Sequence, residues 1–200
     1  MAAKINLLLK RAIDLFGSLL GAIVLSPFIG LVAIMIKLGS KGPVFFRQNR
    51  LGKNGKTFEL LKFRTMVTNA ENIGDGIFVR EETDQRITKV GKLLRSTSLD
   101  ELPQLLNVIK GEMSLVGPRP PVPYHPYKYE NYSQEQIKRF LMKPGITGLA
   151  QIRVRNSAPW EKRITIDVEY IESFNVCLDI KILVITVLKL FRKDNIYLGS

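Results

Sequence analysis

The apolar segment AIDLFGSLLGAIVLSPFIGLVAIMI, residues Ala12–Ile36, decides how this chain is organised. It contains a single charged residue, Asp14, close to its start. As a continuous helix it would extend roughly 37 Å, enough to cross a hydrocarbon layer of about 30 Å. The pair Ser26-Pro27 stands near its middle. Because proline lacks a backbone donor and clashes with the preceding turn, we predict a kink at this pair.

Basic residues flank the segment on both sides, at Lys4, Lys10 and Arg11 before it and at Lys37, Lys41, Arg47, Arg50, Lys53 and Lys56 after it. Basic residues favour the cytoplasmic side of a membrane, so both ends of the segment favour the same side. A broken helix that enters one leaflet and turns back satisfies this preference, whereas a helix that spans the membrane remains the alternative. A cleaved signal peptide is disfavoured, because the apolar run is too long and no small-residue cleavage site follows it.

The composition restricts the partners. The chain has 200 residues, which fits one domain of ordinary size with a short appendage. Its 30 Lys and Arg against 18 Asp and Glu give a net charge of +12, which indicates nucleic acid, an anionic membrane or phosphorylated substrates. Cys177 is the only cysteine, so an intrachain disulfide is excluded, and His125 is the only histidine, which makes a zinc site improbable.

The middle of the chain contains a predicted β-hairpin and several short helices. Residues 44–46 and 57–61 flank Lys53-Asn54-Gly55-Lys56, and Asn-Gly favours a tight hairpin turn because both residues tolerate positive φ. We interpret residues 67–84 as a loop and predict helices over 88–95, 99–110 and 133–142. Gly111 is placed to end the second helix, and Lys143-Pro144-Gly145 to form a turn after the third.

The C-terminal segment is a predicted amphipathic helix. From Asp179 to Lys193, apolar residues follow helical spacing among basic ones, as expected of a helix in a membrane interface, although a helix that faces the core gives the same pattern. We therefore expect an α+β fold that is mostly helical, with a membrane helix over residues 1–40, a domain with a β-hairpin over 41–176, and an amphipathic interfacial helix over 177–200.

The adjacent acids Asp100 and Glu101 are the strongest candidates for chemistry. Ser98 and Glu101 have the spacing of a capping box, so on spacing alone a structural role at a helix start is favoured. Carboxylates can also bind Mg²⁺ or attack phosphorus to form an acyl phosphate. The basic residues that would bind phosphate oxygens beside them are Lys62, Arg64, Arg95, Arg119, Arg153 and Arg155.

The chain closely resembles the bacterial sugar transferases, the monotopic polyprenol-phosphate phosphoglycosyl transferases. The resemblance rests on the ordered motifs Arg86-x-Thr88-x-x-Gly91-x-x-Leu94-Arg95, Ser98-Leu99-Asp100-Glu101-Leu102-Pro103-Gln104-Leu105 and Gly117-Pro118-Arg119-Pro120. Further matches are Phe46-Arg47-Gln48, Lys62-Phe63-Arg64-Thr65-Met66, Pro144-Gly145-Ile146-Thr147-Gly148 with Gln151, and Trp160-Glu161. The matches extend over nearly the whole chain, including the Ser26-Pro27 break, and the chain looks like the minimal form of the family.

This resemblance implies a two-step reaction. Asp100 matches the family's nucleophile, which attacks the β-phosphate of a UDP-sugar and releases UMP. A polyprenyl phosphate then attacks the phosphosugar-enzyme intermediate to give a polyprenyl diphosphate sugar, the first membrane step of glycoconjugate assembly. Glu101 matches the second acid, and the two acids are the implied site of Mg²⁺. The positions of Lys62, Arg95, Arg119 and Arg155 imply contact with the acids or phosphates.

The resemblance also implies a re-entrant helix broken at Ser26 and Pro27, with both ends on the cytoplasmic face of a bacterial inner membrane. The expected partners are thus a UDP-sugar, polyprenyl phosphate and membrane lipids. Nucleic acid is not expected, because neither a recognisable binding motif nor aromatic residues for base stacking are evident. A non-enzymatic membrane anchor and a hydrolase of nucleotide diphosphates are the competing hypotheses. The sugar, the length of the polyprenol and the oligomeric state stay open.

Overall fold

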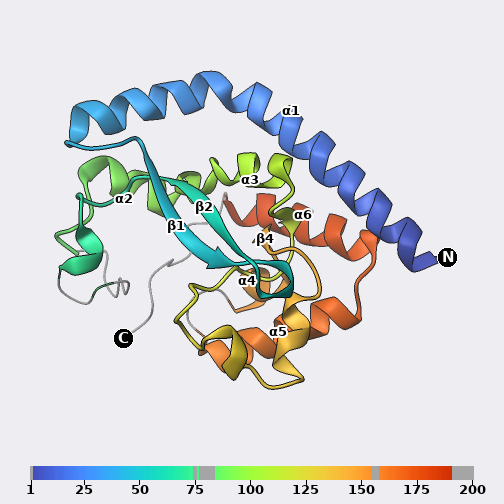
Figure 1. Cartoon of the computed structure of the whole chain (residues 1–200). Coiled ribbons are helices and arrows are strands. Elements are labelled where there is room, and N and C mark those ends of the chain that lie inside the picture. Colours follow the sequence, from blue (N-terminus) through green and yellow to red (C-terminus); the bar gives the residue numbers. More distant parts are fainter. Residues whose placement is uncertain (1, 74–75, 77–83, 155–157, 191–200) are drawn as a thin grey trace.

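The computed structural model describes residues 2–73, 76, 84–154 and 158–190. The elements are α1 (Ala2–Gly39), β1 (Phe45–Leu51), β2 (Thr57–Phe63), α2 (Lys89–Ser96), α3 (Gln104–Lys110), β3 (Ser114–Val116), β4 (Gly145–Thr147), α4 (Leu149–Arg153), α5 (Trp160–Glu172) and α6 (Val176–Leu190). Figure 1 shows α1 along one side of the molecule, with the other helices packed around two small sheets. The predicted α+β fold, mostly helical with a β-hairpin, is confirmed.

The helix α1 is continuous through the predicted break. Pro27 lies inside the helix, and Figure 1 shows one continuous helix that curves along its length. The Ser26 hydroxyl donates to the carbonyl of Ile23 at 2.8 Å, which gives a partner to a carbonyl one turn before the proline. Proline thus bends this helix without ending it, and the helix reaches Gly39, beyond the apolar run itself.

Each half of α1 buries one face against the rest of the protein, whereas no residue between Ser18 and Val32 is buried. The buried residues recur with a four-residue spacing, at Lys10, Asp14 and Ser18 in the first half and at Val32 and Ile36 in the second. The other faces are apolar and exposed, and only 11% of the most apolar stretch is buried. By length and composition this helix is able to cross a membrane. Its contacts, however, place both of its halves against the same globular body.

Buried polar groups fix α1 to β3 and α6. The Lys10 ammonium bonds the Asp179 carboxylate at 2.6 Å and the carbonyl of Val116 at 2.8 Å, and the Tyr170 hydroxyl donates to the same carboxylate at 2.7 Å. The Asp14 carboxylate accepts from the backbone N–H of Leu115 at 2.9 Å. Since buried charges require partners, these contacts tie α1 to the strand that leads into Gly117-Pro118-Arg119-Pro120.

We expect Lys10→Met to lower the free energy of unfolding by about 3 kcal/mol or more, because it leaves the Asp179 carboxylate buried without its cation. The matched control is Arg153→Met, which removes an exposed ion pair with Glu169 and should cost less than about 1 kcal/mol. Chemical unfolding of the two variants in the same detergent makes the comparison. Equal losses would contradict the role given to Lys10.

The predicted hairpin is confirmed, including its turn. β1 and β2 pair antiparallel, from Phe45 opposite Phe63 to Leu51 opposite Thr57. Asn54 has φ 56° and Gly55 has φ 73°, the positive angles for which the Asn-Gly pair was singled out. The hairpin places Lys62, near the end of β2, beside the loop that carries Asp100.

The helix predicted over 99–110 is wrong in its first third. Residues Leu99–Glu101 form a 3₁₀ turn, and α3 begins only at Gln104. Pro103 separates the two, as expected of a residue that prefers the start of a helix. Gly111 ends α3 with φ 86°, as predicted. The helix predicted over 133–142 is a 3₁₀ helix at Gln136–Phe140, and the parallel pair of β3 and β4 was not predicted.

The helix α6 has one buried face and one exposed apolar face. Asp179 and Ile182 are buried, whereas Ile180, Val184 and Leu188 are about half exposed or more. The helix therefore contributes to the core and also presents apolar side chains outward. Its interfacial role stays a prediction, and residues 191–200 of the predicted 177–200 segment lie outside the described residues.

Candidate functional site

The acid pair lies in a tight turn rather than at a capped helix start. Ser98 has φ 56° and its side chain makes no capping hydrogen bond, so the capping-box interpretation is wrong. The 3₁₀ turn that follows buries Asp100 and directs the Glu101 side chain to basic residues on other elements. Neither acid therefore caps the start of a helix. Both face the cluster of basic side chains described next.

Basic side chains converge on the acids from separate segments. The Lys62 ammonium on β2 lies 2.6 Å from a Glu101 oxygen and 3.5 Å from an Asp100 oxygen. The Arg119 guanidinium, from the proline-flanked loop, lies 3.2 Å from the same Glu101 oxygen. The convergence of Lys62 and Arg119 on the acids is therefore present, and it joins parts of the chain that are far apart in sequence.

The two acids differ in their electrostatics. Burial raises the pKa of Asp100, and the neighbouring Glu101 charge raises it further, against the opposing effect of Lys62. Burial alone would also raise the pKa of Glu101, but the charges of Lys62 and Arg119 and their hydrogen bonds lower it to about 2. Glu101 is thus held ionised, whereas the Asp100 carboxylate is the more basic and the better nucleophile once ionised.

A cavity of about 690 Å³ opens beside the acid pair. Among the residues predicted for the site, Lys62, Arg95, Asp100 and Arg119 line it, and Glu101 joins through its ion pairs. This volume is in the range of pockets that enclose a drug-sized ligand. Arg64 also lines the cavity, whereas Arg153 forms an exposed ion pair with Glu169 and Arg155 lies outside the described residues. Ser26 and Pro27 lie in α1, and none of the described lining residues belongs to that helix.

Arg95 and Arg119 are held in place by neighbours. Arg95 donates from its Nε to the Thr65 hydroxyl at 3.0 Å. The carbonyl of Arg119 accepts from the buried Arg139 guanidinium at 2.9 Å, and Arg139 in turn pairs with buried Asp167 at 2.6 Å. The Pro118-Arg119-Pro120 loop, already restricted by its two prolines, is therefore also supported by a buried ion pair behind it.

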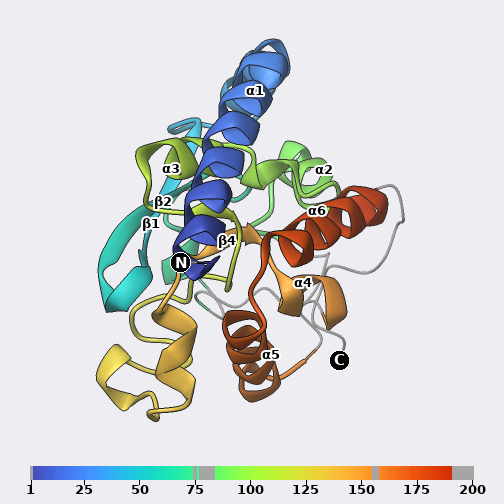
Figure 2. The ribbon, with the colours of Figure 1, turned by 90° about the vertical axis from the view of Figure 1, so that its right-hand side faces the viewer.

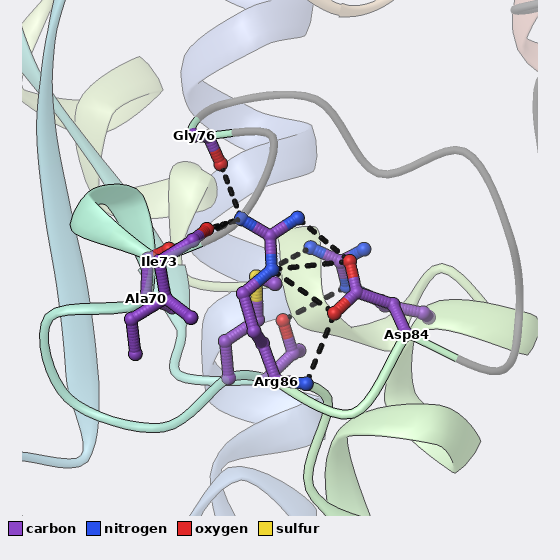
Figure 3. A network of polar contacts seen from close by, with 8 residues as sticks. Ala70, Ile73, Gly76, Asp84 and Arg86 are labelled. Atoms are coloured by element: carbon purple, nitrogen blue, oxygen red, sulfur yellow. Dashed lines mark hydrogen bonds and ion pairs between the residues drawn. The ribbon is translucent and has the colours of Figure 1, made fainter.

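A third arginine, Arg86, organises one wall of the cavity (Figure 3). Its guanidinium donates to the carbonyls of Ala70, Ile73 and Gly76 at 3.1, 2.7 and 2.6 Å. It also pairs with the Asp84 carboxylate at 2.7 Å. Ala70 and Gly76 line the cavity. Arg86, which appeared in the sequence only as part of a motif, thus shapes the site without lining it.

The sequence interpretation missed part of the site. His125, Trp160 and Arg163 also line the cavity, and the Arg163 guanidinium stacks on the Trp160 ring at 4.8 Å. The signal was present but not used. Arg163 and Asp167 stand four residues apart, on one face of a helix that the spacing of Ile164, Val168 and Ile171 predicts, and α5 was not among the predicted helices.

The donor chemistry at the acid pair fits Mg²⁺. This ion is usually held by one or two carboxylates together with substrate phosphates and water, rather than by a complete set of protein ligands. Asp100 and Glu101 supply two adjacent carboxylates, and Asp100 lines the cavity. Among the described residues there is no cluster of three or more His, Cys, Asp or Glu of the kind that encloses a metal by itself.

Comparisons with known proteins point to one family. The family model described as bacterial sugar transferase matches residues 5–193. The chain is 46% identical over 198 residues to the UDP-glucose:undecaprenyl-phosphate glucose-1-phosphate transferase of Klebsiella pneumoniae, covering 96% of this chain and 42% of that protein. It is 41% identical to the protein of the same name in Caulobacter vibrioides, covering 94% of this chain and 72% of that one.

A shorter relative matches almost end to end. The exopolysaccharide production protein PSS of Rhizobium leguminosarum bv. phaseoli is 43% identical, with 91% of this chain and 94% of that protein covered. The chain therefore spans about two fifths of the Klebsiella relative but nearly all of the Rhizobium one.

Proposed function

The chain belongs to the bacterial sugar transferase family, and from this premise we propose that it transfers a sugar 1-phosphate from a UDP-sugar to polyprenyl phosphate. The products are UMP and a polyprenyl diphosphate sugar. The observation that carries the proposal is the buried Asp100 on the wall of a cavity, beside Lys62, Arg95 and Arg119. The names of two relatives, glucose-1-phosphate transferases that act on undecaprenyl phosphate, support the same reaction class.

In the first step an Asp100 carboxylate oxygen attacks the β-phosphorus of the donor. The bond from that phosphorus to the bridging oxygen breaks, and its electron pair leaves with the oxygen on UMP. Asp100 then carries the sugar phosphate as an acyl phosphate. In the second step a phosphate oxygen of the lipid attacks the same phosphorus, the acyl phosphate bond breaks, and the Asp100 carboxylate is regenerated.

The surrounding charges suit these steps. Lys62 contacts both acids, so its ammonium stabilises charge that moves from Asp100 to the phosphate oxygens. Arg95 and Arg119 present guanidinium groups, which hold phosphate oxygens in a bidentate manner. Mg²⁺ at Asp100 and Glu101 would supply further neutralisation of the diphosphate. Because Lys62 and Arg119 lower the pKa of Glu101 to about 2, Glu101 is ionised and holds both basic side chains beside Asp100.

The test of this proposal is a screen of UDP-sugars with polyprenyl phosphate that measures UMP release and the lipid-linked product. One UDP-sugar should give both products in equal amounts, and excess chelator should abolish the reaction because the phosphates then lose their neutralising cation. Restoration by Mg²⁺ is the control for damage by the chelator. Release of free sugar phosphate without any need for the lipid would support the hydrolase instead, and full activity in chelator would contradict the role of Mg²⁺.

We further propose that the protein is monotopic, at the cytoplasmic face of a bacterial inner membrane. Both halves of α1 pack against one globular body. A helix held in this way cannot place its two ends on opposite sides of a hydrocarbon layer of about 30 Å unless that body also lies in the layer. The apolar outer faces of α1 and α6 and the basic flanks suit insertion into one leaflet.

The topology has a direct test. With the exposed Cys177 replaced, single cysteines at Ala3 and Lys41 should both react only with a reagent on the cytoplasmic side. In Pro27→Leu the bend should relax, but both tags should still react only from the cytoplasmic side, because both halves of α1 remain packed on the same body. Labelling of Ala3 from outside in the parent protein would show a spanning topology and exclude the re-entrant one.

A further inference from the structure

The cavity extends beyond the acid pair to a second group of residues around α5. The Arg119 guanidinium lies 3.2 Å from the Glu101 carboxylate of the acid pair. Its positive charge also lowers the pKa of Arg163. Arg163 stacks on Trp160, whose ring lies 5.7 Å from His125. Arg119, His125, Trp160 and Arg163 all line the cavity. They form one corner, which we call the α5 corner.

The α5 corner carries concentrated positive charge. Burial, together with the charges of Arg119 and Arg139, lowers the pKa of Arg163 to about 10, against the opposing effect of Asp167. Burial and the charges of Arg163 and Arg50 also lower the pKa of His125. The nearby acids Asp167 and Glu101 already hold ion pairs with Arg139 and Lys62. An incoming anion would relieve this repulsion.

A second wall of the cavity differs in chemistry. Thr68, Asn69 and Asn72 line it, and these uncharged hydrogen-bonding side chains suit sugar hydroxyl groups. Arg64, which also lies on that side, is committed to the backbone, because its guanidinium bonds the carbonyls of Lys41 and Ser40 at 2.6 and 2.8 Å. A donor whose reacting phosphorus lies at Asp100 would therefore place its sugar toward this wall and its second phosphate toward the α5 corner.

The position of α5 in the molecule agrees with this orientation. Figures 1 and 2 show α5 on the side of the protein away from α1. A water-soluble nucleotide would approach from that side, whereas a lipid-linked acceptor would reach the acids from the side of the membrane helix.

We propose that Arg163, together with Arg119, binds the nucleotide-side phosphate of the donor, the phosphate that leaves in the nucleoside monophosphate, with Trp160 and His125 as the wall beside the nucleoside. This subsite rests on the proposed function for its ligand class, a nucleoside diphosphate sugar. Trp160 holds the Arg163 guanidinium through a cation–π contact, so its fork is ordered before the phosphate arrives.

The experiment is equilibrium binding of UMP and of uridine to the purified full-length chain. The variants are Arg163→Met, which keeps the apolar stem, Arg163→Lys, and the control Lys162→Met at the adjacent exposed position of α5. A charge-assisted contact to phosphate predicts that Arg163→Met weakens UMP binding about 10- to 100-fold and uridine binding less than about threefold. Arg163→Lys should fall between Arg163→Met and the parent, and Lys162→Met should match the parent.

Several outcomes would overturn the subsite. They are UMP binding by Arg163→Met within about twofold of the parent, equal losses for UMP and uridine, and no UMP binding by the parent. If Arg163→Met does not fold, Arg163→Lys carries the test, and an unchanged UMP affinity in that variant overturns the inference. The proposed function is judged separately, because UMP binding needs neither the sugar nor the lipid. If the parent transfers sugar phosphate but UMP binds equally well to the parent and to the Arg163 variants, the proposed function stands and the subsite is wrong.

Discussion

The Asp100→Asn variant should lose transfer activity by about a thousandfold or more, because a carboxamide is a poor nucleophile at phosphorus and no acyl phosphate can form. The substitution preserves shape and volume in a buried position, so folding should be little affected. Initial rates of UMP release at saturating donor and lipid make the measurement. The parent, but not the variant, should also acquire the mass of a sugar phosphate when incubated with donor alone.

Two controls separate the chemistry from general damage. Glu169→Gln neutralises an exposed acid on α5 that pairs with Arg153, and it should retain full activity. Thermal unfolding of Asp100→Asn should resemble that of the parent. If Asp100→Asn retains activity within about tenfold of the parent, Asp100 is not the nucleophile, and the carboxylate would then act only in binding.

Glu101→Gln should lower turnover by about a hundredfold or more, because it removes the charge that positions Lys62 and Arg119 and one of the two carboxylates proposed for Mg²⁺. The glutamine keeps the length of the side chain, so hydrogen bonds to Lys62 and Arg119 can partly persist. The loss should therefore be smaller than that of Asp100→Asn, and the formation of the covalent intermediate should be slowed rather than absent. Single-turnover kinetics with donor alone would distinguish the two variants.

The alternative for Glu101 is purely structural. A residue that only caps a helix would cost roughly 1 kcal/mol of stability when replaced and leave turnover intact. The left-handed Ser98 without a capping bond already argues against that role. If Glu101→Gln keeps its turnover and loses stability, the structural role would nevertheless be supported. Turnover and unfolding should therefore be measured on the same preparation.

Local signals in the sequence determined much of the fold. The Asn-Gly pair fixed the hairpin, because few residues accept the positive φ angles that its turn requires. Gly111 marked the end of α3 for the same reason. The length and composition of the apolar segment determined α1. Thr88 and the residues after it determined α2, because the Thr88 hydroxyl accepts from the Gly91 N–H at 2.9 Å and so caps the first turn of the helix.

Other features depended on contacts that no local pattern records. Glu101 has the spacing of a capping box, yet its carboxylate pairs with Lys62 and Arg119 from distant segments, and these long-range charges outweigh the roughly 1 kcal/mol that a cap provides. The parallel pairing of β3 with β4 joins segments about thirty residues apart, each only three residues long. Segments that short have too little periodicity to predict their partners.

The sequence by itself determined the family, the acid pair and the basic residues that act with it, because a reaction on phosphates restricts which residue types can serve. Only the tertiary structure decided that both halves of α1 pack on one body, and that His125, Trp160 and Arg163 share a cavity with Asp100. Burial, pairing and the distance between side chains are properties of the packed chain. They arise where segments remote in sequence exclude water together, and no single segment carries that information alone.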